Sequence, residues 1–193
     1  MEQTPPELAE RFFGAWIAAT SGMKPELVDN WRNAAAFTSL VKSNDDCVLR
    51  RVANSLGLQC YPHDYYSTDA ILFRDRDRVE GAPVNSTWLS GAEVCFEHEN
   101  FVRSGLYKEV SHLLLMNAGL KVLVTYPIGG VDDPEIENVR SVIQGSRHQA
   151  EVAKDRSFLL ILGYETGFAW EGFVYGKDGG WERIPRGAAG SNA

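Results

Sequence analysis

The sequence contains few cysteines and no long hydrophobic run. Its three cysteines, Cys47, Cys60 and Cys95, lack the CxxC spacing of a zinc site, and their odd number argues against a disulfide scaffold. We interpret them as small, mostly buried hydrophobic side chains. No apolar run approaches the roughly 20 residues that a helix needs to cross a bilayer. Because the first residues also lack the basic and apolar segments of a signal peptide, we expect a cytoplasmic protein without membrane contacts.

Basic residues are in the minority. Lysine and arginine number 19 against 26 aspartates and glutamates, which gives a net charge of −7 at pH 7. This balance argues against nonspecific binding of nucleic acid over the whole surface, but it leaves room for a local basic groove. Residues 74–78 alternate arginine with aspartate, a pattern typical of a self-compensated segment that faces solvent.

Several short catalytic motifs are also missing. The chain has no GxxxxGK[ST], no GxGxxG after a strand, no GxSxG and no HExxH. These absences exclude the common P-loop NTPases, dinucleotide-binding enzymes, nucleophile-elbow hydrolases and zincins. No internal repeat is present, and the small-residue tail at 187–193 is expected to be disordered.

Hydrophobic periodicity and turn residues predict the order helices, two strands, helix, strand, helix, strand and closing hairpin. The predicted helices span residues 5–20, 24–43, 44–60, 104–119 and 132–155, and the predicted strands span 63–75, 91–100, 120–127 and 157–165, with a hairpin over 167–184. Strand–helix–strand succession implies right-handed parallel crossovers, whereas the two earlier strands are expected to pair as a hairpin. The pattern therefore predicts an α/β fold with a mixed central sheet flanked by helices.

We expect one domain over residues 1–186. Within it, residues 1–58 supply N-terminal helices, 60–165 the core and 166–186 the closing hairpin. The length suits a single domain with a substantial core.

Two carboxylates stand out on the predicted strand at 91–100. Strand side chains alternate between faces, so Cys95, Glu97 and Glu99 should share one face of the sheet. If the preceding strand pairs with this one, Asp69 joins them within a few ångströms. Like charges that close cannot all ionise cheaply, and a hard divalent cation such as Mg²⁺ would resolve the conflict.

Simpler interpretations remain open. Glu97 and Glu99 can lie on a solvated sheet face opposite basic residues, and Asp69 can cap a turn or pair with an arginine. His98 points to the opposite face and is expected to be structural. The same geometry makes it a poor base for a nucleophilic Cys95.

The segments STDAILF, EVCFEHEN, LYKEVSHLLLMN and LKVLVTYP together resemble the core of the PD-(D/E)xK nuclease superfamily, the restriction-endonuclease-like fold. The resemblance covers roughly residues 45–126. Asp69 stands at the first acidic position of the family pattern and Glu97 at the second. Glu99 stands where the family usually has lysine, and Lys108 in the following helix is the candidate replacement.

The resemblance implies a restriction-endonuclease-like core and metal-dependent hydrolysis of phosphodiester bonds. Asp69, Glu97 and Glu99 would be the metal ligands for Mg²⁺ or Mn²⁺, and all three would be catalytic together with Lys108. The implied partner is nucleic acid, DNA rather than RNA, and a homodimer is one expected state. The alternative is an inactive member of the fold that serves as a protein-binding or immunity-type module.

Overall fold

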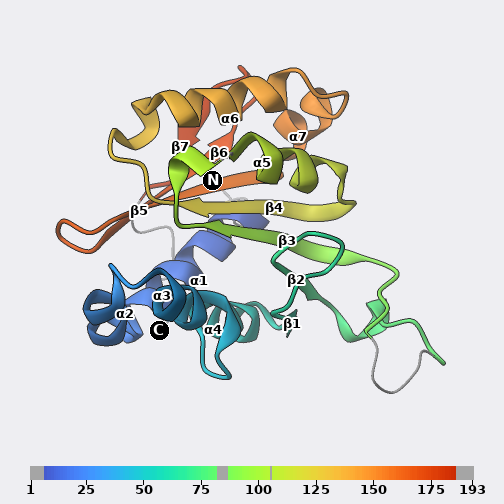
Figure 1. Cartoon of the computed structure of the whole chain (residues 1–193). Coiled ribbons are helices and arrows are strands. Elements are labelled where there is room, and N and C mark those ends of the chain that lie inside the picture. Colours follow the sequence, from blue (N-terminus) through green and yellow to red (C-terminus); the bar gives the residue numbers. More distant parts are fainter. Residues whose placement is uncertain (1–6, 82–86, 105, 186–193) are drawn as a thin grey trace, which may run out of the picture.

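The computed structural model describes residues 7–81, 87–104 and 106–185. These residues form an α/β structure in which a seven-stranded mixed sheet carries helices on both faces (Figure 1). The predicted fold class, a mixed central sheet flanked by helices, is thereby confirmed. The expected disordered tail at 187–193 lies outside the described residues.

The strands follow one another across the sheet in sequence order, from β1 to β7. They are β1 (Gln59–Tyr61), β2 (Ala70–Phe73), β3 (Ala92–Glu99), β4 (Ala118–Thr125), β5 (Phe158–Tyr164), β6 (Ala169–Tyr175) and β7 (Trp181–Arg183). The three central strands β3, β4 and β5 are parallel, and every other neighbouring pair is antiparallel. The hairpin predicted for the strands at 63–75 and 91–100 is therefore present as the pair β2 and β3. The predicted closing hairpin is present as the pair β6 and β7.

Two groups of helices cover the sheet. One face carries α1 (Leu8–Gly22), α2 (Lys24–Asn30), α3 (Ala34–Thr38), the π-helix η1 (Ser39–Ser43) and α4 (Val48–Leu56). The other face carries α5 (Leu106–Leu115), α6 (Pro134–Gln144) and α7 (Gln149–Asp155) (Figure 1). Short 3₁₀ turns lie at η2 (Asp75–Asp77), η3 (Val102–Ser104) and η4 (Gly130–Asp132). No helix among the described residues is both long enough and apolar enough to cross a membrane.

The sheet separates two hydrophobic cores. Val94 and Phe96 of β3 pack with α1 and its neighbours, whereas Cys95 packs with α5 and α6. This alternation is the one expected for a strand with both faces covered. It confirms the predicted assignment of the two faces of β3.

The predicted helix at 24–43 is wrong in its length, because three shorter helices occupy it. The break falls after α2, where Asn33 begins α3 by accepting a hydrogen bond from the backbone N–H of Ala36 at 3.2 Å. Trp31 at the break packs edge-on against Phe37, with ring centroids 5.0 Å apart. A cap and an aromatic contact across the break thus override the local helical periodicity.

Other predicted elements are also too long. The helix expected at 44–60 is helical only over α4, and its last two residues belong to β1, a strand that was not predicted. The strand expected at 63–75 is a strand only over Ala70–Phe73, because Tyr66 and Ser67 adopt left-handed φ angles of 52° and 67° in a turn. The helix expected at 132–155 is interrupted after Gln144, where α6 ends, and resumes as α7 at Gln149.

Gly172 of β6 offers a test of how α1 packs on the sheet. A Cβ at this position would lie 2.8 Å from the ring of Phe13, closer than real Cβ atoms approach. We expect Gly172→Ala to lower the free energy of unfolding by roughly 1–3 kcal/mol in urea denaturation. Gly180→Ala is the matched control, because nothing lies within 4 Å of a Cβ there. Equal losses of stability in the two variants would contradict this packing.

Candidate metal centre

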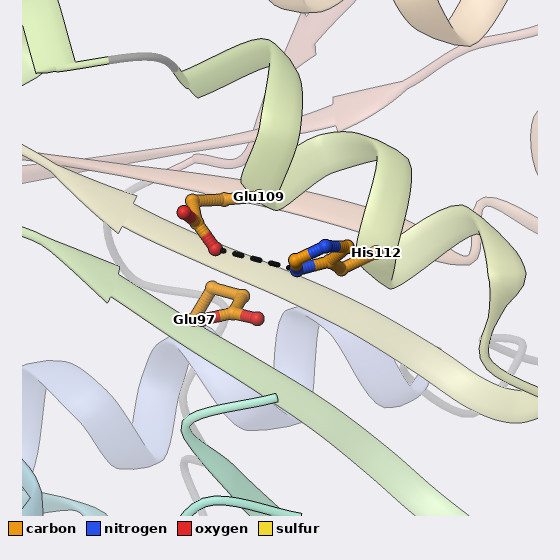
Figure 2. Close-up of side chains that lie close together, drawn as sticks. All are labelled: Glu97, Glu109 and His112. Atoms are coloured by element: carbon orange, nitrogen blue, oxygen red, sulfur yellow. Dashed lines mark ion pairs between the residues drawn. The ribbon is translucent and has the colours of Figure 1, made fainter. Parts of the chain in front are cut away.

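The candidate site lies at the carboxyl end of β3, between β2 and the helix α5. Glu97 is on the face of β3 that α5 covers, and its side chain points toward that helix (Figure 2). It is only 3% exposed. Within the described parts of the chain, its Oε1 atom has no hydrogen-bond partner.

This environment favours the neutral form of Glu97. Burial raises its pKa to about 9, and the negative charges of Asp69 and Glu109 act in the same direction. A backbone hydrogen bond from Asp69 and the charge of Lys42 oppose the shift but do not cancel it. Without a further cation, the folded protein therefore holds this carboxyl protonated near neutral pH.

Asp69 immediately precedes β2, whose first residue, Ala70, is the antiparallel partner of Phe96. One oxygen of Asp69 accepts a hydrogen bond from the backbone N–H of His98 at 2.9 Å, and the other forms an ion pair with the Lys42 ammonium. Asp69 and Glu97 therefore lie close enough for their charges to interact, as the predicted hairpin required.

Helix α5 contributes two ligand groups that the sequence analysis missed. Glu109 and His112 lie three residues apart on the helix, with Glu109 Oε2 and His112 Nδ1 separated by 3.7 Å (Figure 2). One ligand atom from each of Glu97, Glu109 and His112 can be chosen so that all three lie within 4.8 Å of one another. This group can hold a metal ion.

The other predicted site residues do not join this group. Glu99 accepts a hydrogen bond from the backbone N–H of Phe101 at 2.7 Å, so its carboxylate closes the turn after β3. The Lys108 side chain is 67% exposed, and its Nζ atom lies 3.8 Å from Oε1 of the neighbouring Glu109. The structure brings Asp69 close to Glu97, although Asp69 is not a member of this group, and it gives Glu99 and Lys108 other surroundings.

Lys42 is the cation that approaches the acidic residues from the opposite layer. It extends from η1, and its side chain is only 16% exposed where it pairs with Asp69. Single turns of π-helix are rare and often lie at functional sites. No sequence signal linked Lys42 to Asp69, because they are 27 positions apart and η1 lies inside a predicted continuous helix.

An aromatic layer supports the other side of β3. His98 lies 2.7 Å from the hydroxyl of Tyr126 through its Nε2 atom, and the ring of Phe37 stacks against it. Burial lowers the pKa of His98 to about 3, with a smaller contribution from the charge of Lys42. His98 is therefore neutral near pH 7, which agrees with the structural role expected of it.

Comparison of the chain with protein-family models, with curated proteins and with solved structures finds no match. The candidate site therefore has to be interpreted from its own geometry and chemistry.

The protonated state of Glu97 can be tested through stability. In metal-free protein, the folded state keeps a proton up to a pKa of about 9, whereas the unfolded chain releases it near the ordinary value of 4.5. The wild type should therefore lose stability as the pH rises through this window. Glu97→Gln cannot ionise, so its stability relative to the wild type should grow by up to about 1.4 kcal/mol per pH unit. Chemical denaturation with a chelator at pH 5 and pH 8 measures this.

Ile128→Ala is the control, because Ile128 is 94% exposed and its side chain carries no ionisable group. Its stability relative to the wild type should be the same at both pH values. A Glu97→Gln variant that behaved like this control would show that Glu97 is ionised in the folded chain.

Proposed function

We propose that this chain hydrolyses phosphodiester bonds of nucleic acid, DNA in preference to RNA, with a divalent metal ion at the centre formed by β2, β3 and α5. The observation that carries the proposal is the buried Glu97 carboxyl, which has no partner for Oε1 among the described residues and faces two further ligand groups. Buried carboxyl groups with strongly shifted pKa values concentrate at functional sites.

The acidic residues are suited to hold such an ion. Carboxylate oxygens are preferred ligands of Mg²⁺ and Mn²⁺, and Asp69 and Glu97 occupy the two acidic positions of the PD-(D/E)xK pattern that the sequence resembles. When bound, the ion would lower the pKa of a water molecule and neutralise charge on the phosphoryl group. Glu97 would then be ionised, because a nearby cation reverses the effect of burial.

Lys42 supports the proposal in the role first assigned to Lys108. A lysine ammonium near the reacting phosphate stabilises the negative charge that develops in the transition state. Lys42 already lies against Asp69, whereas Lys108 is directed mostly to solvent. We therefore assign charge stabilisation to Lys42. Glu99 remains a predicted ligand in this proposal only if its bond to Phe101 is released.

The shortage of free basic residues favours a second candidate function. Arg51, for example, is paired with Asp46 through two hydrogen bonds of 2.7 and 2.6 Å. With a net charge of −7, the chain is also suited to be an inactive member of the fold that binds a basic protein partner, as an immunity-type module would. For either function, we propose that the protein is cytoplasmic and forms a homodimer.

A nuclease assay separates the two functions. Wild type, Glu97→Gln, Lys42→Met and Lys108→Met are incubated with single-stranded DNA, double-stranded DNA and RNA, each with Mg²⁺ or Mn²⁺. We expect metal-dependent cleavage by the wild type, a loss of about 100-fold or more in Glu97→Gln and Lys42→Met, and little change in Lys108→Met. Circular dichroism of each variant confirms that it is folded.

The assay also has a clear negative outcome. If folded wild-type protein cleaves none of these substrates with either ion, or if Glu97→Gln cleaves as fast as the wild type, the hydrolytic function is rejected. Loss of activity in Lys108→Met with full activity in Lys42→Met would return the charge-stabilising role to Lys108.

A further inference from the structure

The metal centre combines two kinds of ligand. Glu97 and Glu109 offer carboxylate oxygens, and His112 offers an imidazole nitrogen. We propose that these three residues form a site selective for a first-row transition-metal ion such as Mn²⁺ over Mg²⁺ and Ca²⁺, and that His112 determines this selectivity. The inference rests on the metal ion of the proposed function and concerns which ion the site selects.

Glu97 is the first support for a real ion site rather than a chance group of surface acids. Glu97 is only 3% exposed, and its Oε1 atom has no hydrogen-bond partner among the described residues. Its side chain points toward Glu109 and His112 (Figure 2). Leaving a buried acceptor unpaired costs about 1–3 kcal/mol. A cation bound between the three side chains would supply the missing partner.

The second support is the rigid placement of the helix ligands. Glu109 and His112 project from the same side of α5, because residues three apart on a helix are neighbours. The helix is anchored beside them by Leu106, Val110 and Leu113, which are fully buried against the sheet. The side chains of His112 and Glu109 remain 28% and 20% exposed, so they lie closer to solvent than Glu97 does.

Ligand chemistry then decides which ion is favoured. Mg²⁺ and Ca²⁺ prefer oxygen ligands, and Mg²⁺ keeps several bound waters in octahedral geometry. Imidazole is a good ligand for transition metals, while carboxylates suit Mn²⁺ as well as Mg²⁺ and Ca²⁺. A nitrogen ligand added to two carboxylates therefore strengthens binding of Mn²⁺ more than binding of the two oxygen-seeking ions. His112 Nδ1 has no hydrogen-bond partner within the described residues, which leaves it available for this role.

The chain contains a matched control pair on α7 and its cap. His148 and Glu151 have the same three-residue spacing, with Nδ1 and Oε2 3.6 Å apart. Their side chains are 56% and 72% exposed, and the metal-ligand group found among the described residues does not include them. This pair shows how much a histidine and a glutamate contribute to metal binding when no buried carboxyl group lies beside them.

The experiment uses the full-length protein, stripped with a chelator, and titrates it by calorimetry with Mn²⁺, Mg²⁺ or Ca²⁺ alone. The variants are His112→Gln, Glu97→Gln and the control His148→Gln, each checked for its melting temperature. We expect wild type and His148→Gln to bind one Mn²⁺ about tenfold or more tightly than Mg²⁺. His112→Gln should lose most of this ratio while its Mg²⁺ affinity changes little, and Glu97→Gln should bind neither ion at this site.

Pulsed electron paramagnetic resonance of bound Mn²⁺ provides a readout that a structural role of His112 would not produce. We expect nitrogen coupling from a coordinated imidazole in the wild type and in His148→Gln, and its disappearance in His112→Gln. The inference is overturned by a wild type that binds no Mn²⁺, by equal affinities for Mn²⁺ and Mg²⁺, or by nitrogen coupling that survives in folded His112→Gln.

These results are distinguishable from those of the nuclease assay. Selective Mn²⁺ binding that depends on His112, without cleavage of any nucleic acid, would reject the hydrolytic function and leave this inference standing. If the wild type cleaves nucleic acid but His112→Gln keeps the same preference between Mn²⁺ and Mg²⁺, the hydrolytic function stands and this inference is rejected.

Discussion

The arrangement of this protein depends on one costly feature, a carboxyl group buried near the end of β3, one of the three central strands of the sheet. Burying an ionised carboxylate without a partner costs several kcal/mol or more, and the chain meets this constraint by holding Glu97 in its neutral form. The nearest acids, Asp69 and Glu109, increase the cost instead of relieving it. Such a group is stable only because large hydrophobic cores on both faces of the sheet hold β3 in place. Keeping the Glu97 carboxyl buried therefore reduces the stability of the fold at this position, as is common at functional sites.

The two helical layers contribute differently to this centre. From one face, α5 adds Glu109 and His112 and closes over Glu97 (Figure 2). From the other layer, η1 brings Lys42 to Asp69 at the start of β2, beside the aromatic support of β3. Two carboxyl groups and an imidazole thus gather beneath α5, while the Lys42 ammonium reaches Asp69 from the opposite side.

Much of the fold was predictable because its signals are local. Alternation along β3 identified the faces of Cys95 and Glu97 correctly, and the hairpin of β2 with β3 brought Asp69 to Glu97 as expected. The continuous apolar strands predicted the buried parallel centre of the sheet. The errors came where tertiary contacts compete with local preference, as at Trp31, whose ring packs against Tyr126 and Trp170 at the break of a predicted helix. The exposed position of Lys108 could not be read from the sequence for a similar reason, because neighbouring residues of a helix point in different directions and only packing decides which of them faces the sheet.

The sequence by itself determined the class of fold, the succession of the strands β2 to β7 along the chain, the side of β3 on which Glu97 lies, and the encounter of Asp69 with Glu97. Periodicity of two or of about 3.6 residues carries that information within short segments. Only the tertiary structure decided that α5 turns Glu109 and His112 toward Glu97, that Lys42 pairs with Asp69, and that Glu97 is deprived of solvent. These features depend on how separate layers pack, and packing is set by side chains far apart along the chain, for which a single sequence contains no periodic signal.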